Sequence, residues 1–354
     1  MSTALRRGVG WRPSPLARSL VVTGAVLVGV VAVALSVGAA ATLGPADVSL
    51  VNVRDVLLNH LGSAQIPVTV TDDAIVWQER LPRALVAAAS GAGLGLCGVV
   101  LQALLRNPLA DPFVLGVSSG ASTGAVLIGV LGVGGGALGL SSGAFVGALL
   151  AFGLVLLLAR YTSNGSQGIV LAGVAGTHLF SAVTSFVVFA FADADATRGV
   201  MFWLLGSLEG MRWPQVWLAV GTVTVGAVVT LVAARSLDAF AFGDDVAASL
   251  GVHVQRTRVL LLVATALLTA VLVSIAGAIG FVGLVLPHAA RLLVGERHRR
   301  VVPVTILLGA LFMTWVDTVS RVAFQPTALP VGVGTALVGV PAFVALLVHR
   351  RSRS

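Results

Sequence analysis

Two charged side chains stand four residues apart inside a long apolar run of the sequence. They are Asp317 and Arg321, in the segment "DTVSR". Side chains at this spacing lie on one face of a helix and can form an ion pair. Because a charge is costly inside a lipid bilayer, such a pair is expected to serve either as a structural clamp or as part of a polar path.

Few other residues could carry chemistry. His178 and His288 lie in apolar segments, and together with Asp317 they make only a thin proton relay. The single Cys97 can form no internal disulfide, and the chain has no lysine, which excludes the GxxxxGK[ST] phosphate loop that binds ATP. The sequence also contains no HExxH motif, His/Cys cluster or Ser-His-Asp arrangement. We expect no catalytic residue and no metal or cofactor bound by this chain.

The composition indicates the elements that must hold these residues. Hydrophobic residues make up 57% of the 354 residues and charged residues only 10%, with a mean hydropathy of +1.01. A soluble protein carries roughly 25% charged residues, so the chain is expected to be a polytopic membrane protein. Its apolar runs are continuous and near twenty residues long, which favours helices over the short alternating strands of a barrel.

Ten apolar runs are long enough to be membrane spans or nearly so. They are residues 20–43, 82–105, 113–134, 142–160, 168–191, 214–234, 258–279, 281–294, 302–323 and 331–348. The sequence therefore predicts an all-α protein with one ten-helix transmembrane domain, residues 20–348, between basic tails at 1–19 and 349–354. The eighth run follows a glycine-rich break, which predicts a kinked or re-entrant geometry, and the piece 199–208 is too short to span.

The arginines predict the orientation. With both ends of the chain in the cytoplasm, 16 of the 22 arginines fall at inner ends or inner loops, as the positive-inside rule requires. The net charge of +8 is therefore explained by the bilayer and needs no nucleic acid. The expected location is the cell membrane (inner or plasma), with both termini on the cytoplasmic side.

Three of the arginines that face outward in this topology need a separate explanation. Arg80 and Arg83, in "RLPR", precede the second span, and Arg321 lies near the outer end of the ninth. Each could simply snorkel to lipid headgroups. Three arginines on the outer side of the membrane favour another interpretation, an electropositive rim that binds acidic groups from outside.

Two local patterns predict packing and an inner contact surface. Gly116, Gly120 and Gly124 form a GxxxGxxxG row, which allows helices to approach closely in lipid. The inner loop 235–258 contains Asp244 and Asp245, which can begin a short helix, and Gly251, which can end it. A compact helical element of this kind is what a cytoplasmic motor subunit could grip, although an ordinary connecting loop is the simpler interpretation.

Several motifs, in order, resemble one known family. They are "RLPR" (80–83), "GVVLQALLRNPLADPFVLGVSSGA" (98–121), "LAGVA" (171–175), "FWLLGSL" (202–208), "GDDVAASLGV" (243–252), "AGAIGFVGLVLPHAARLLVGERHR" (276–299) and "LPVGVGTALVGVPAFVALL" (329–347). The chain is similar in these segments to the FecCD-type permeases of ABC importers for iron–siderophores, haem and vitamin B12.

The resemblance implies a type II importer permease that works as a dimer, with a second copy or a paralogue. Two cytoplasmic ATPase subunits, which use ATP and Mg, would dock on one side, and an extracytoplasmic substrate-binding protein on the other. The residue roles it implies are these: binding-protein docking by Arg80, Arg83 and Arg321; a cytoplasmic gate at Asn107, Leu109, Ser166 and Gln167; ATPase coupling in the loop at about 236–257 through Gly243, Asp244, Ala247, Leu250 and Gly251; and an outer vestibule at Trp203, Gly206 and Ser207.

One departure from the family pattern concerns Ala328, which stands where many relatives have glutamate before Leu-Pro. Alanine has no carboxylate, so we expect the contacts of that glutamate to be missing in this chain. The expected cargo is an iron–siderophore complex, with haem or cobalamin as the alternatives. Two rival classes are a proton-coupled secondary transporter, which an uncoupler would stop, and a membrane scaffold, which would stimulate no ATP hydrolysis.

Overall fold

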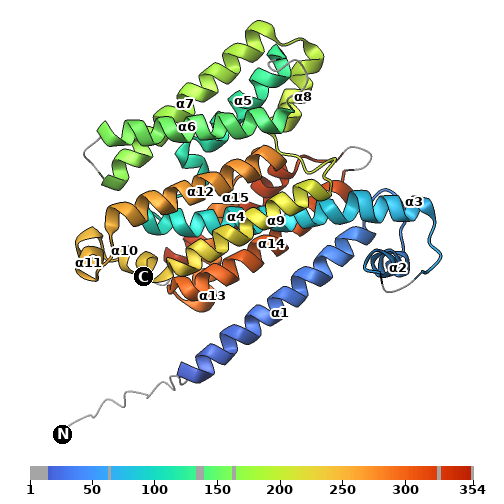
Figure 1. Ribbon diagram of the computed structural model, residues 1–354, viewed down its shortest axis with the longest axis horizontal. Helices are drawn as coiled ribbons and strands as arrows, with labels where there is room; N and C mark the ends of the chain where they lie inside the picture. Colours follow the sequence, from blue (N-terminus) through green and yellow to red (C-terminus); the bar gives the residue numbers. More distant parts are fainter. Residues whose placement is uncertain (1–14, 63–64, 133–138, 162–164, 325–327, 352–354) are drawn as a thin grey trace.

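The computed structural model describes residues 15–62, 65–132, 139–161, 165–324 and 328–351. Within these ranges the chain forms helices and no strand (Figure 1). Ten of the helices are apolar: α1 (Pro15–Thr42), α4 (Leu81–Leu104), α5 (Val117–Leu131), α6 (Leu140–Tyr161), α7 (Gly165–Phe191), α9 (Trp213–Val232), α12 (Val254–Ala276), α13 (Val282–Val294), α14 (His298–Val322) and α15 (Val331–Arg351). Shorter elements connect them: α2 (Leu50–His60), α3 (Val70–Asp73), the π-helical η1 (Ala74–Arg80), the 3₁₀ turn η2 (Pro112–Leu115), α8 (Ala194–Leu204), α10 (Ala234–Phe240) and α11 (Asp244–Ser249).

Each predicted span coincides with one of these ten helices, so the all-α prediction is confirmed. In the described ranges, seven helices are long and apolar enough to cross a membrane, and α5, α13 and the apolar part of α15 (Val331–Ala345) are shorter. The predicted break before the eighth run is also present, because the chain between α12 and α13 is irregular. The piece 199–208 is confirmed as too short to span, since α8 ends at Leu204.

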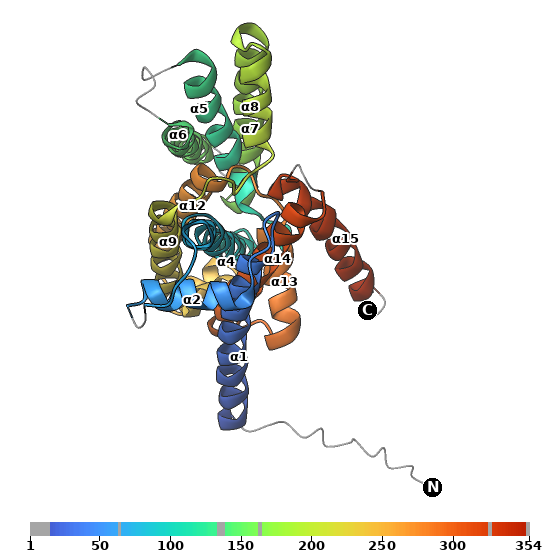
Figure 2. The ribbon, with the colours of Figure 1, turned by 90° about the vertical axis from the view of Figure 1, so that its right-hand side faces the viewer.

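Helix α4 lies at the centre of the bundle, surrounded by α1, α9, α12, α13 and α14 (Figure 2). Its sequence, rich in alanine and glycine, allows this central position. A side chain at Gly91 would collide with the backbone carbonyl of Gly309 on α14, and one at Gly98 with that of Gly283 on α13. Small residues therefore let three backbones meet without intervening side chains, as expected for helices packed in lipid.

Helices α5, α6 and α7 form a second group beside this bundle, together with α8 (Figure 1). Gly120 and Gly124 on α5 pack directly against Gly147 and Gly143 on α6, where an added Cβ would strike backbone atoms. The close-packing role predicted for the GxxxG row is confirmed at these two positions.

The two ends of the helices carry different short elements (Figure 1). Helices α10 and α11 lie at one end, which we call the α11 end, and α2 and α3 lie at the opposite end. The start of α1 and the end of α15 lie toward the α11 end, as expected for an even number of crossings.

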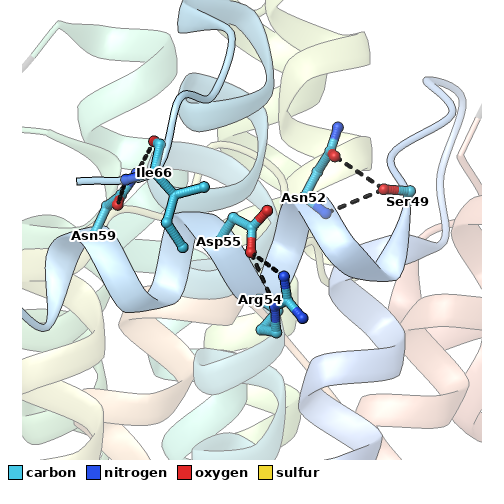
Figure 3. Close-up of polar contacts among 6 residues, drawn as sticks. All are labelled: Ser49, Asn52, Arg54, Asp55, Asn59 and Ile66. Carbon is cyan, nitrogen blue, oxygen red and sulfur yellow. Dashed lines mark hydrogen bonds and ion pairs between the residues drawn. The ribbon is translucent and has the colours of Figure 1, made fainter. Parts of the chain in front are cut away.

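The segment between α1 and α4, for which the sequence analysis predicts no helix, contains local hydrogen bonds around α2 (Figure 3). Ser49 caps α2 by accepting from the Asn52 N–H at 3.1 Å. The Asn59 side chain accepts from the Ile66 N–H and donates to its carbonyl, both at 2.8 Å, which closes the loop that follows α2.

Candidate functional site

Arg80 binds the end of α1. Its guanidinium is buried and donates to the carbonyls of Ala41 at 3.1 Å and Thr42 at 2.9 Å, and also to that of Ala46. The last carbonyls of a helix lack partners within the helix and carry partial negative charge. Arg80 therefore acts as a remote cap that joins the beginning of α4 to the end of α1.

Arg83 and Asp317 form a buried ion pair between α4 and α14. Arg83 Nε donates to Oδ2 of Asp317 at 2.9 Å, and Nη2 donates to Oδ1 at 2.8 Å. This two-point geometry is the strong form of an arginine–carboxylate contact. The predicted pairing of Asp317 with Arg321 is therefore wrong: the carboxylate faces across to α4, and Arg83 occupies both of its oxygens.

Arg321 instead reaches the same helix end as Arg80. Its Nη2 donates to the carbonyl of Ala40 at 2.8 Å, and its side chain is buried. The structure thus brings together the three arginines predicted to dock a binding protein. It also shows that within this chain they are buried and engaged, and are not displayed freely as a rim. Their docking role stays a prediction.

The sequence analysis missed an aromatic stack next to these arginines. Trp77 lies between the His60 ring, stacked at 4.0 Å, and Trp213, whose ring centroid is 4.5 Å away. Trp213 Nε1 donates to the Trp77 carbonyl at 3.0 Å, which ties α9 to η1. The available signal was the tryptophan just before "RLPR", since tryptophan is enriched at membrane–water interfaces.

The residues predicted for an outer vestibule lie where three irregular segments cross. Ser207 N–H donates to the Ala276 carbonyl at 3.0 Å, and the Gly206 carbonyl accepts from Val331 N–H at 3.0 Å. Gly206 has a φ of +77° and its Cα abuts Gly277, so no larger residue fits there without strain. Trp203, half-buried at the end of α8, presents its carbonyl to Gly277.

The predicted gate residues lie at the α11 end, in two places. Asn107 Oδ1 accepts from the Leu109 N–H at 2.9 Å, which shapes the turn after α4, and Leu109 is exposed. Ser166 is in the first turn of α7; its side chain lies outside the described residues, and the neighbouring Gln167 is exposed. Among the described hydrogen bonds none joins the turn at Asn107 to Gln167, so the two gate elements remain separate predictions.

The loop predicted to couple to a motor folds as two short helices, α10 and α11. Helix α11 begins at Asp244, directly after Gly243 with a φ of +104°, and ends in a two-bond motif around Gly251, whose φ is +84°. There Gly251 N–H donates to the Ala248 carbonyl at 2.9 Å and Val252 N–H to that of Ala247 at 3.0 Å. The predicted start and end of this helix are confirmed.

One face of α11 is fixed and the other is free. Asp244 accepts two hydrogen bonds, at 2.7 and 2.8 Å, from Nη2 of Arg258 at the beginning of α12, and Ala247 is fully buried. On the opposite face the residues Val246 and Leu250 are 44% and 67% exposed. Helix α11 is thus anchored to α12 on one face and exposes two apolar residues on the other.

Comparisons with known proteins agree with this architecture. The profile of the FecCD transport family matches residues 24–349. The cobalamin import system permease BtuC of Halobacterium salinarum is 44% identical over 299 residues, covering 82% of this chain and 78% of the relative. The iron(3+)-hydroxamate import system permease FhuB of Bacillus subtilis is 33% identical over 314 residues, covering 88% of this chain and 79% of that protein.

Among solved structures, a metal-chelate type ABC transporter in an inward-facing conformation superposes with a TM-score of 0.80 at 29% identity, over 92% of this chain and 99% of that one. PsaBC of Streptococcus pneumoniae, at 18% identity and a TM-score of 0.52, shares the fold over 75% of this chain and 90% of that one. With the family profile matched along nearly its whole length, the chain belongs to the FecCD transport family and is an ABC-importer permease.

Proposed function

We propose that this chain is the membrane-spanning subunit of an importer for a bulky metal chelate, assembled with a second permease, two ATPase subunits and an extracytoplasmic binding protein. The observation that carries the proposal is helix α11: a short helix held by the Asp244–Arg258 ion pair, with Val246 and Leu250 exposed on its outer face. ATP-driven movement of a bound ATPase subunit would be transmitted through α11 to α10 and α12.

The experiment is to measure ATP hydrolysis by the reconstituted complex with Leu250→Asp. An aspartate on the exposed face should weaken the apolar contact and lower permease-stimulated hydrolysis by about tenfold, the loss expected when one well-packed apolar anchor is removed. Leu61→Asp is the control, measured without the binding protein, because Leu61 is also well exposed but lies at the opposite end of the molecule. Unchanged stimulation in Leu250→Asp would refute the coupling role of α11.

The orientation that this function requires places α11 in the cytoplasm and α2 and α3 outside. The arginine distribution supports it. Because the only native cysteine, Cys97, is buried, single cysteines introduced at Val70 and Leu250 can be labelled selectively in intact cells. A membrane-impermeant maleimide should modify the Val70→Cys variant and leave Leu250→Cys unmodified until the membrane is opened; the reverse pattern would overturn the topology.

Docking of a binding protein is proposed for the end of the molecule that carries Arg80, Arg83 and Arg321. The support is their convergence around the end of α1, where Arg83 is paired with Asp317 while Arg80 and Arg321 bind backbone carbonyls. Carboxylates on the binding protein would pair with these arginines. Each such pair would contribute roughly 1–3 kcal/mol to the binding free energy when partly desolvated.

Because the arginines also hold helices together, replacing them confounds docking with folding. The sharper test therefore changes the acidic residues of the binding protein to glutamine, which leaves the permease intact. We expect a several-fold to hundredfold weaker complex and a smaller dependence on salt. An unchanged dissociation constant would remove docking from these three residues.

For the cargo, two candidates are supported by the relatives. Cobalamin is favoured by the 44% identity to the Halobacterium permease, and a ferric siderophore by the similarity to FhuB along 88% of the chain. Titration of the cognate binding protein with cyanocobalamin, a ferric hydroxamate and haem separates these candidates, because that protein selects the ligand before the permease meets it. Tight binding of haem alone would contradict both.

A further inference from the structure

A cavity of about 640 Å³ lies at the α11 end between three segments far apart in sequence. Its walls come from the turn after α4 (106–108), the connection between α10 and α11 (241–242) and the turn between α13 and α14 (296–298). A volume of this size falls within the range of about 300–1,000 Å³ that is typical of small-molecule sites.

The charges around the cavity leave two arginines unbalanced. Asp238 is occupied by His298, accepting from its backbone N–H at 2.9 Å and contacting its Nδ1 at 2.7 Å. Glu296 lies 3.5 Å from Nε of Arg291, which also donates to Gln102 at 2.6 Å. Arg106 and Arg297 are exposed, and neither belongs to an ion pair among the described residues. The cavity therefore has an excess of positive charge at its edge.

Arg106 has an unusual backbone conformation. It follows α4 with a φ of +49°, and its N–H donates to Ala103 while Asn107 N–H donates to Gln102, the two-bond helix ending in which this position is normally glycine. A left-handed conformation is unfavourable for arginine, and such outliers concentrate at functional sites. The guanidinium of Arg106 lies next to Gly243, the residue that precedes α11. A Cβ atom added to Gly243 would be 3.4 Å from Nη1 of Arg106.

Two further side chains shape the cavity. His298 lines the cavity and is more than nine-tenths buried, and its Nε2 has no hydrogen-bond partner in the described part of the chain. Phe242 is 74% exposed and supplies an apolar aromatic wall. Arginine fits phosphate and carboxylate groups through paired N–H donors.

We propose that this cavity is a binding site for a small organic anion, with its phosphate or carboxylate held between Arg106 and Arg297 and its apolar body against Phe242. A free cytoplasmic metabolite and an anionic lipid headgroup share this chemistry. On the proposed function, an occupant would tie the gate turn at Asn107 to α11 and to the start of α14, and so restrain the movement that opens the gate.

The test uses the full-length permease in phosphatidylcholine nanodiscs without ATPase subunits, so that it does not depend on the transport function. Inorganic phosphate and AMP are titrated at constant ionic strength, and binding is followed by the thermal unfolding midpoint. AMP should bind saturably and more tightly than phosphate, because its base can contact Phe242. Arg297→Gln should raise the dissociation constant of AMP about tenfold or more, as expected for a lost charge-assisted contact.

Arg106→Gly separates the ligand contact from the fold. Glycine adopts the left-handed conformation without strain, so this variant should unfold at a higher temperature than the parent without ligand and bind AMP at least about tenfold more weakly. Arg299→Gln is the matched control, because Arg299 is an exposed arginine in the first turn of α14 that does not line the cavity. Its dissociation constant should stay within about twofold of the parent, since remote surface charges are screened by salt.

Nanodiscs containing phosphatidylglycerol distinguish the two sources of the anion. If a lipid headgroup is the natural ligand, phosphatidylglycerol should weaken AMP binding by competition, and this effect should vanish in Arg297→Gln. If a soluble anion is the ligand, AMP should bind equally in both lipids. The proposal fails if neither probe binds and phosphatidylglycerol leaves the unfolding midpoint unchanged. It also fails if Arg297→Gln and Arg106→Gly bind AMP as the parent does, or if Arg299→Gln loses as much affinity as Arg297→Gln.

Discussion

Arg83 on α4 and Asp317 on α14 are joined by two hydrogen bonds, of 2.9 and 2.8 Å, with both side chains almost fully enclosed by the bundle. Next to them Arg80 and Arg321 bind the final carbonyls of α1. Three helices are therefore connected at one end by polar contacts, whereas their central contacts depend on small residues. This end of the bundle is the one for which the docking of a binding protein is proposed.

Replacement of Asp317 by asparagine should strongly destabilise the protein. The variant leaves Arg83 buried without a counter-charge, a change that typically costs about 3–5 kcal/mol in a folded protein. The measurement is the free energy of unfolding, or the half-life of the folded protein in detergent at a fixed temperature.

The double variant Arg83→Met with Asp317→Leu is the control for that experiment. It removes both charges and keeps apolar volume, so it should recover most of the lost stability. If Asp317→Asn alone were as stable as the parent, water or lipid headgroups would have to reach Arg83.

The sequence predicted the apolar helices better than their contacts. All ten apolar helices follow from the length of their apolar runs, because a bilayer leaves an apolar segment few alternatives to a helix. The partner of Asp317, however, lies 234 residues away on α4. Local spacing favours Arg321, but that side chain is drawn to the Ala40 carbonyl, and no sequence pattern records which remote guanidinium caps a helix.

A second prediction concerns the contact between α5 and α6. Gly124→Ala should destabilise the protein by about 2 kcal/mol or more, because the new methyl group would strike the Gly143 carbonyl and the two backbones must separate. Gly153→Ala on α6 is the matched control: its surroundings are open, and alanine favours a helix by roughly 1 kcal/mol. Equal effects of the two substitutions on unfolding would show that close packing at Gly124 is unimportant.

The rows of small residues illustrate a packing feature that can be predicted from sequence for a physical reason. Glycines spaced by four must lie on one face of a helix, and a bare backbone face is useful only against another helix. Which helix it meets depends on the whole topology. Gly98 meets Gly283, at the second residue of the short helix α13, a pairing that no local spacing indicates.

A third prediction uses the buried carboxyl of Asp111, in the turn between α4 and α5. Its Oδ1 accepts from the Phe113 N–H at 3.0 Å, and burial raises the pKa of the carboxyl from 3.8 to about 6. Compared with the unfolded chain, the folded protein favours the protonated carboxyl of Asp111. This preference adds to the free energy of unfolding at low pH, and the added stability is lost as the pH rises from about 4 to about 6.

Asp111→Asn keeps the acceptor at the start of η2 and removes the ionisation. The variant should be more stable than the parent at pH 7, by up to about 3 kcal/mol, with the difference shrinking toward pH 4. Ser49→Asn, which exchanges one uncharged cap of α2 for another, is the control and should change stability equally at both pH values. A gain for Asp111→Asn that does not depend on pH would contradict the burial of an ionised carboxylate.

The last prediction separates the shape of α11 from its chemistry. Gly251 has a φ of +84° and open space around it, so a side chain there is limited only by backbone strain. Gly251→Ala should therefore cost about 1 kcal/mol and shift the end of α11, whereas Gly251→Asn should be milder because asparagine tolerates this conformation. If α11 transmits motor movement as proposed, transport per ATP hydrolysed in the reconstituted complex should fall in Gly251→Ala and be largely restored in Gly251→Asn. Loss of transport of the same size in both variants would indicate that the residue is needed for a direct contact, since the two differ chiefly in the ease with which they adopt the left-handed turn.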